Sequence, residues 1–123
     1  MIEFQIENDT TEPLGKIHGR VTWTPEKEVT PKALIVSLMW RTEGRGSEAK
    51  DTVAEVRQTP GPVFAGDPFE MEFEFEIPEE GPVTYNGKLI RVIWEVHFRA
   101  DIPWAWDVTD ATLITVEPRL VAR

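Results

Sequence analysis

Apolar and polar residues alternate with a period of two along most of this chain. In the clearest run, Phe69, Met71, Phe73, Phe75 and Ile77 alternate with Glu70, Glu72, Glu74 and Glu76. Successive side chains of a β-strand point to opposite faces, so such a run predicts a strand with one buried face. Six further runs show the same pattern, at 2–7, 16–24, 32–41, 51–58, 88–99 and 111–117. The pattern therefore predicts about seven strands.

Prolines and glycines fall mostly between these runs, and no segment has the period of a helix. Seven or eight alternating strands in a chain of 123 residues are typical of a two-sheet antiparallel β-sandwich of the immunoglobulin-like class. No linker or internal repeat divides the sequence. We therefore expect an all-β fold with a single domain at 1–123.

Ten residues, 78–87, connect two of the predicted strands and contain two prolines and two glycines. This connection is longer than a tight hairpin needs, so it predicts a crossing from one sheet to the other. We expect Tyr85 to act there as a tyrosine corner, with its hydroxyl bonded back to the backbone. Asn86 and Gly87 are expected to supply positive φ angles before the next strand.

Several short motifs in this region, taken in order, resemble those of arrestin-like domains. The motifs are Gly15–Val21, Phe73–Pro78, Gly81–Gly87, Ile90–Val96 and Arg99–Asp107. Thr84 stands where that family usually has serine. The resemblance, which extends to bacterial sporulation-control proteins, implies an immunoglobulin-like sandwich that binds other proteins and has no chemistry of its own.

Charge and composition narrow the possible partners. The formal net charge is −9, and such a surface repels nucleic acid and anionic lipid. No apolar run is long enough to insert across a membrane, and the acidic N-terminus does not resemble a signal peptide. Cysteine is absent. We therefore expect a cytoplasmic location, with neither nucleic acid nor membrane as a partner.

Residues for catalysis are few. The chain has two histidines, His18 and His97, and two serines, Ser37 and Ser47, and no nucleophile elbow or phosphate loop. Both histidines fall on the polar faces of predicted strands. A Ser-His-acid triad is defined by geometry, so the sequence alone leaves it open. We expect no enzymatic activity, no cofactor and no metal.

The acidic run forms a row of four carboxylates on one strand face: Glu70, Glu72, Glu74 and Glu76. One interpretation is a solvated outer face balanced by Lys or Arg of the neighbouring strand. The alternatives are a docking face for a basic partner and a divalent cation site, although a flat strand makes a poor calcium cage.

Five tryptophans fall into two groups. Trp23, Trp40 and Trp94 lie on apolar strand faces and are predicted to be core residues. Trp104 and Trp106 flank Ala105 after Pro103, where a period of two would place both on the same side. They are expected to plug one end of the sandwich; the alternatives are exposed anchors for a protein partner or a platform for sugars.

The polar segment 42–51 contains two glycines and is interpreted as a mobile connector, with a binding role left open. The sequence as a whole predicts a non-enzymatic scaffold or adaptor that binds another protein through a sheet edge or an end loop. Self-association through the same edges is equally open. The alternative is a ligand- or glycan-binding module that uses Trp104 and Trp106.

Overall fold

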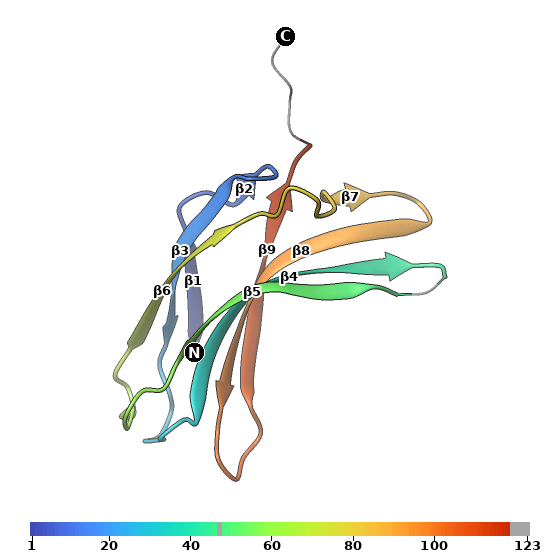
Figure 1. Ribbon diagram of the computed structural model, residues 1–123. Coiled ribbons are helices and arrows are strands. Elements are labelled where there is room, and N and C mark those ends of the chain that lie inside the picture. The colour runs from blue at the N-terminus through green and yellow to red at the C-terminus, as the bar shows by residue number, and fades with distance from the viewer. Residues whose placement is uncertain (47, 119–123) are drawn as a thin grey trace.

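The computed structural model describes residues 1–46 and 48–118, which form strands and connecting loops (Figure 1). The strands are β1 (Ile2–Ile6), β2 (Thr10–Thr11), β3 (Lys16–Trp23), β4 (Ala33–Gly44), β5 (Lys50–Gln58), β6 (Phe69–Glu76), β7 (Tyr85–Asn86), β8 (Ile90–Asp101) and β9 (Val108–Val116). All seven predicted strands are present, so the all-β prediction is confirmed. The two short strands β2 and β7 were not predicted. Within the described part of the chain, no helix is long and apolar enough to cross a membrane.

The strands form two sheets that face each other (Figure 1). The smaller sheet has the order β1-β3-β6, and the larger has the order β2-β9-β8-β4-β5, with β7 paired to β8. Every pairing is antiparallel except that of β2 with β9, which is parallel. The predicted two-sheet sandwich is therefore confirmed, with one parallel pair added.

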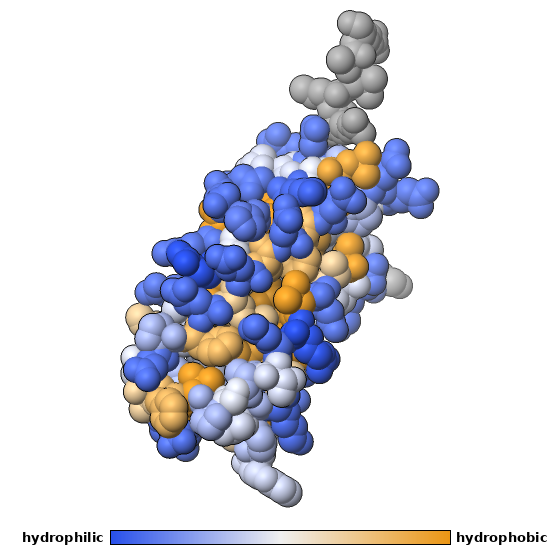
Figure 2. Space-filling model, turned by 60° about the vertical axis from the view of Figure 1, so that its left-hand side comes forward, coloured by the Kyte–Doolittle hydropathy of each residue, from blue (hydrophilic) through white to orange (hydrophobic). Residues whose placement is uncertain are grey.

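The core lies between the sheets because the apolar faces of the alternating strands meet there. Trp94 is completely buried, and the rings of Trp23 and Phe98 lie 6.2 Å apart, centroid to centroid. Trp40 is half-buried and packs against the same cluster. Burying each such large side chain stabilises the fold by about 1.5–3 kcal/mol. On the face shown in Figure 2, hydrophilic side chains predominate, and a narrow band of hydrophobic ones runs between them.

The larger sheet extends beyond the smaller one as an arm formed by β7 and the paired ends of β4, β5 and β8 (Figure 1). The strand β4 continues to Gly44 and β5 begins at Lys50, so the connector predicted at 42–51 was too long. Gly44 has a φ of 133°, and a Cβ there would clash with the Leu89 carbonyl oxygen. Only glycine fits this close approach, which lets β4 reach the tip of the arm.

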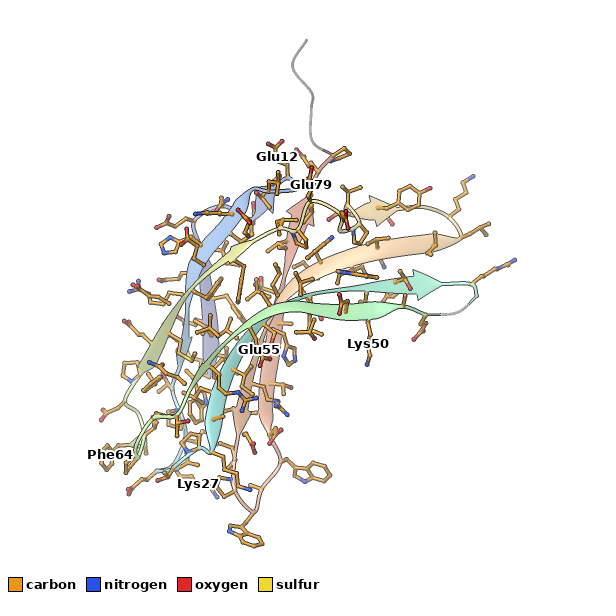
Figure 3. The ribbon with its side chains drawn as sticks, viewed as in Figure 1. Glu12, Lys27, Lys50, Glu55, Phe64 and Glu79 are labelled. Atoms are coloured by element: carbon orange, nitrogen blue, oxygen red, sulfur yellow. The ribbon has the colours of Figure 1, made fainter. Side chains whose placement is uncertain are left out.

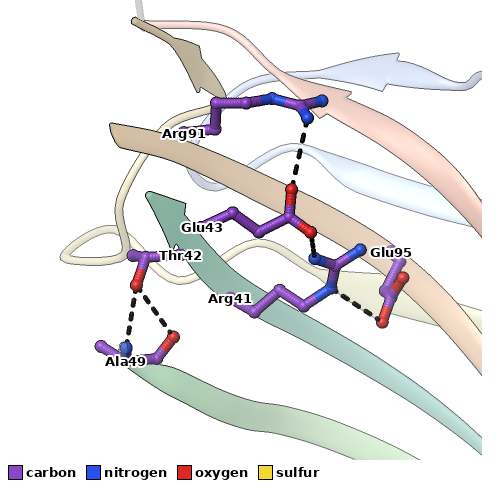
Figure 4. A network of polar contacts seen from close by, with 6 residues as sticks. All are labelled: Arg41, Thr42, Glu43, Ala49, Arg91 and Glu95. Carbon is purple, nitrogen blue, oxygen red and sulfur yellow. Dashed lines mark hydrogen bonds and ion pairs between the residues drawn. The ribbon is translucent and has the colours of Figure 1, made fainter. Parts of the chain in front are cut away.

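Polar contacts hold the arm together across its strands (Figure 4). Arg41 of β4 contacts Glu43 and, at 3.8 Å, Glu95 of β8, while Arg91 of β8 contacts Glu43 at 3.3 Å. The Thr42 hydroxyl accepts a hydrogen bond from the Ala49 amide at 2.8 Å. The end of β4 is thus held on both sides. Charged side chains tie it to β8, and Thr42 ties it to Ala49, just before β5.

The segment 78–87 crosses between the sheets as predicted, because β6 belongs to the smaller sheet and β7 to the larger. Tyr85 is not a tyrosine corner: it is 55% exposed, and its hydroxyl has no hydrogen-bond partner among the residues described. The Trp94 indole N–H donates to the Pro82 carbonyl at 2.9 Å instead. Thr84 accepts from the Val116 amide at 2.8 Å through its hydroxyl and donates its own amide to the Val116 carbonyl. Trp94 and Thr84 therefore make the contacts that Tyr85 was expected to make.

Asn86 and Gly87 do not adopt the positive φ angles that were predicted. Glycine is needed at position 87 for a different reason. A Cβ there would lie 2.5 Å from the ring of Tyr85, which covers the glycine.

Candidate functional site

The loop 102–107, between β8 and β9, lies at the end of the sandwich opposite β2 and β7 (Figure 1). Trp104 is 104% exposed and Trp106 is 93% exposed, so the prediction that they plug this end was wrong. Ile102 of the same loop packs against the core, next to the buried Trp23. The end of the core is therefore already closed beneath the two tryptophans.

The backbone of this loop explains why the two tryptophans separate. Trp104 has a φ of 61°, in the left-handed region, directly after Pro103. A proline followed by a residue of positive φ is typical of the two central residues of a type II turn. Glycine is the usual residue at the second of these two positions. A tryptophan in this conformation costs about 1–2 kcal/mol of backbone energy. The period of two, which assumes an extended strand, does not apply across the turn.

An apolar groove of about 330 Å³ lies beside Trp106. Its lining comes from the N-terminus, the β3–β4 loop and both sides of the loop 102–107, and consists of Met1, Trp23, Thr24, Pro25, Glu26, Lys27, Val29, Ile102, Ala105, Trp106 and Val108. Trp106 forms part of the wall, whereas Trp104 does not line the groove. We call this surface, with Trp104, the tryptophan end.

Backbone contacts fix the segments that surround the groove. The N-terminal amine of Met1 donates to the Thr24 carbonyl at 3.0 Å. Val29 and Val63 pair through two backbone hydrogen bonds, which tie the β3–β4 loop to the β5–β6 loop. Phe64, half-exposed on the β5–β6 loop, points outward at this same end (Figure 3). Exposed apolar side chains from three separate segments thus lie at this end of the sandwich: Met1, Phe64 and the two tryptophans of the loop 102–107.

Most of the groove has no counterpart in the sequence pattern. Pro25, Val29 and Val108 come from loops and a strand start far apart along the chain, and only the folded sheets bring them together. Loops have no regular alternation of apolar and polar residues, so the sequence pattern did not predict that these residues meet. The tryptophan pair was the one feature of this surface that the sequence could identify.

The acidic residues Glu70, Glu72, Glu74 and Glu76 lie elsewhere, on the outer face of β6 at the edge of the smaller sheet. Lys16 of β3 contacts Glu74 at 3.8 Å, and Arg20 contacts Glu70 at 3.5 Å. The predicted balance by basic residues of the neighbouring strand is therefore confirmed for two of the four carboxylates. The structure does not bring this acidic row together with the tryptophan end.

A second depression, of about 520 Å³, lies on the same outer face. Glu72, Arg20 and His18 are among its lining residues. The His18 Nδ1 lies 3.1 Å from a carboxylate oxygen of Glu7, and this hydrogen bond raises the pKa of His18 above its ordinary value of 6.5. All these side chains are exposed or half-exposed, so the depression is polar and open to water.

Among the residues that the structure describes, the candidate catalytic side chains do not form a hydrogen-bonded triad. Ser37 of β4 lies opposite His97 of β8 and opposite Glu55 of β5. Among the residues described, no hydrogen bond joins the Ser37 hydroxyl to either neighbour, and Ser47 lies outside them. Residues 1–46 and 48–118 contain no group of three or more His, Asp or Glu side chains that could hold a metal ion.

Comparison with known proteins identifies the fold. Neither a protein-family model nor a curated protein matches the sequence. Among solved structures, the chain is similar to Spo0M, the sporulation control protein of Bacillus subtilis, with a TM-score of 0.75 and 23% sequence identity. The match covers 94% of this chain and 48% of Spo0M, so the chain spans about half the length of that protein. The chain therefore has the fold of an arrestin-like domain, as its sequence motifs implied.

Proposed function

We propose that this chain is a non-enzymatic adaptor or scaffold domain of the cytoplasm that binds another protein at the tryptophan end. One observation carries the proposal: two tryptophans of one loop are each more than 90% exposed, and one of them, Trp106, lines an apolar groove. Exposed apolar surface of this kind marks interaction sites in soluble proteins, and tryptophan is enriched at binding hot spots. The strained turn at Trp104 adds support, because the fold gains no packing in return for it.

The proposed occupant is an apolar side chain of a partner protein, carried on an extended segment. A groove of about 330 Å³ suits one or two large side chains rather than a folded element. Glu26 and Lys27 are the charged residues of its lining, so the groove itself carries no strong net charge. Apolar contact rather than charge would therefore supply most of the affinity. The acidic row on β6 remains a predicted second contact for a basic surface.

The test compares the wild-type chain with a Trp104→Ala/Trp106→Ala variant as baits in lysate of the source cell. A partner identified by mass spectrometry is then purified, and its Kd is measured for each bait. Loss of a hot spot of about 2 kcal/mol or more weakens binding by about 30-fold or more. The matched control is Tyr85→Ala/Leu89→Ala, which removes two exposed apolar side chains from the opposite end. Equal affinity for the wild-type chain and the Trp104→Ala/Trp106→Ala variant would overturn the proposal.

The full exposure of both rings also supports the glycan-binding alternative, because sugars stack on open aromatic faces. Calorimetric titration of the wild-type chain with soluble oligosaccharides tests it directly. Heat of binding that disappears in the Trp104→Ala/Trp106→Ala variant would replace the adaptor function with that of a sugar-binding module. Absence of heat, together with a tryptophan-dependent protein partner, would support the adaptor.

A further inference from the structure

The strand β1 is the outermost strand of the smaller sheet, and within the described chain it pairs with β3 alone. The Glu7 amide donates to the His18 carbonyl, and Met1 and Thr24 exchange two backbone hydrogen bonds. Odd-numbered residues of β1 therefore direct their backbone groups toward β3. Backbone groups alternate in direction along an antiparallel strand, so those of the even-numbered residues point outward. The outward-pointing residues are Ile2, Phe4 and Ile6.

These outward groups are open to a further strand. Among residues 1–46 and 48–118, no hydrogen bond joins the amide or carbonyl of Ile2, Phe4 or Ile6 to a partner. The side chains of the same three residues are half-buried against the core. Phe4 and Ile6 also line the depression of about 520 Å³, so this part of the edge is accessible from solvent. The edge thus combines unused donors and acceptors with apolar side chains that another strand would cover.

Each of the other sheet edges has a feature that discourages strand pairing. The edge strand β6 bears four glutamates and lies between Pro68 and Pro78. The edge strand β5 carries charges of both signs, and its pairing with β4 contains a register shift. On β9, the Ala111 amide already donates to the Asp110 carboxylate at 2.8 Å. By contrast, β1 contains a single charged residue, Glu3, and no proline.

We propose that a second copy of this chain binds the open edge of β1, with the two strands antiparallel about a two-fold axis at Phe4. Phe4 then faces its own counterpart, and Ile2 faces Ile6 of the other copy. In this register the outward donors of each strand meet the outward acceptors of the other. The half-buried apolar side chains of both strands meet on the core side of the extended sheet. A two-fold interface is self-complementary, and this strand satisfies that condition.

The charges on the outer face distinguish this register from its neighbours. With the axis at Phe4, Glu3 lies opposite Gln5 of the other copy. In the same register, Glu7 lies opposite Met1. An axis at Glu3 would instead place the two copies of Glu3 opposite each other, and an axis at Gln5 would place Glu3 opposite Glu7. Like charges directly opposite are destabilising, so the axis at Phe4 is favoured over both.

Arg20 adds an attraction across the interface in this register. Its guanidinium donates to the Gln5 side-chain oxygen at 2.8 Å, and Gln5 is the residue that faces Glu3 of the other copy. The Glu3 carboxylate therefore approaches a cation of the other copy. Each copy also carries a net charge of −9, so the two copies repel each other as they approach. Salt that screens this repulsion is expected to strengthen the dimer.

The experiment measures the mass of the chain by sedimentation equilibrium from micromolar to millimolar concentration, in low and moderate salt. The wild type is expected to form a dimer that tightens with salt. Gln5→Glu places like charges opposite each other twice in the interface, so it is expected to weaken the dimer by about tenfold. The matched control, Gln58→Glu, makes the same change at an exposed position of β5, in the other sheet, and is expected to weaken it by less than about twofold. A wild type that stays monomeric at every concentration, or equal weakening in the two variants, overturns the proposal.

The opposite charge change tests the register. Gln5→Lys places a lysine opposite Glu3 of the other copy and is expected to tighten the dimer. Gln58→Lys changes the net charge equally and is expected to tighten it less. In a register about Gln5, two lysines would face each other, so a dimer weakened by Gln5→Lys would contradict the axis at Phe4.

Two further readouts locate the interface. The Trp104→Ala/Trp106→Ala variant is expected to dimerise like the wild type, because the proposed pairing does not use the loop 102–107. In the wild-type chain, the amide protons of Ile2, Phe4 and Ile6 should exchange more slowly as the concentration rises. A dimer that is lost in the tryptophan variant, or that leaves these three amides in fast exchange, would place the interface elsewhere and sink the β1 pairing.

Discussion

The two ends of this sandwich both combine proline-containing turns with tryptophan, and they use the tryptophan in opposite ways. At one end, the completely buried Trp94 of β8 donates its indole N–H to the Pro82 carbonyl of the segment 78–87. At the tryptophan end, Trp104 and Trp106 follow Pro103, are almost fully exposed, and donate no hydrogen bond within the described chain. The tryptophan of one end stabilises the fold, and those of the other end face the solvent.

This contrast shows that the element carrying a tryptophan decides its role. Trp94 lies on a long alternating strand, so its ring is directed into the core by the period of two. Trp104 lies in a turn of positive φ, where that period ends. Three predictions test this contrast, from the largest expected effect on stability to the smallest, and a fourth concerns a surface pair outside both ends.

Replacing the buried ring should have the largest effect. Trp94→Ala removes a fully buried side chain and leaves a cavity, so we expect a loss of about 3–5 kcal/mol in the free energy of unfolding. Chemical denaturation followed by circular dichroism measures it. Trp106→Ala is the matched control and should lie within about 0.5 kcal/mol of the wild type. Similar losses in the two variants would erase the contrast between the ends.

Removing the hydroxyl of Thr84 should have the second largest effect on stability. Thr84→Val leaves the Val116 amide without its acceptor in a buried place, which costs about 1–3 kcal/mol. Thr84→Ser keeps the hydroxyl and should retain most of the stability. The midpoints of urea unfolding for the two variants provide the comparison. If valine proves as stable as serine, the corner is held by packing rather than by this hydrogen bond.

Replacing Trp104 in the strained turn should change the stability in the opposite direction. Trp104→Gly relieves the positive φ but makes the unfolded chain more flexible, so we expect a change between zero and a gain of about 1 kcal/mol. Trp106→Gly relieves no strain and should lose about 0.5–1 kcal/mol. Partner binding should weaken in both variants. A clear loss of stability in Trp104→Gly would mean that the ring supports the fold after all.

The exposed His18–Glu7 pair, outside both tryptophan-bearing turns, should have the smallest effect. Glu7→Gln removes the main cause of the raised pKa, so the pKa of His18 should fall toward 6.5, whereas Glu74→Gln should lower it less. In the wild type, the pair stabilises the fold below pH 6.5, and this contribution is lost as the pH rises through the raised pKa. Titration of the imidazole by NMR measures the shifts. A larger shift for Glu74→Gln would make Glu74, rather than Glu7, the main cause of the raised pKa.

The sequence predicted the strands well because each has a buried face that leaves a period of two. It missed β2 and β7, since two residues are too few to show a period. It ended β4 too early because the arm leaves the cover of the smaller sheet, where polar residues such as Thr42 and Glu43 suit both faces. The alternation of apolar and polar residues reflects the burial of one strand face, so it ends where a strand leaves the core.

The candidate site was predictable only in part. The acidic row of β6 was placed on an outer face by its alternation, and its basic partners on β3 were predicted in kind. Trp104 and Trp106 were identified as unusual but were assigned to the core, because neither the positive φ of Trp104 nor the packing of Ile102 leaves a mark in the sequence. The groove depends on loops that meet only in the folded chain.

The separation of buried from exposed tryptophans also gives the protein two optical populations. The rings of Trp23 and Trp94 lie away from water, so their emission should be blue-shifted and insensitive to iodide. The rings of Trp104 and Trp106 should emit at longer wavelength and be quenched by it. An occupant of the groove would shield Trp106, which lines it, and leave the emission of the fully buried Trp94 unchanged. Iodide quenching of the exposed tryptophan emission can therefore report binding at the proposed surface without a label. The emission of the buried tryptophan serves as the reference.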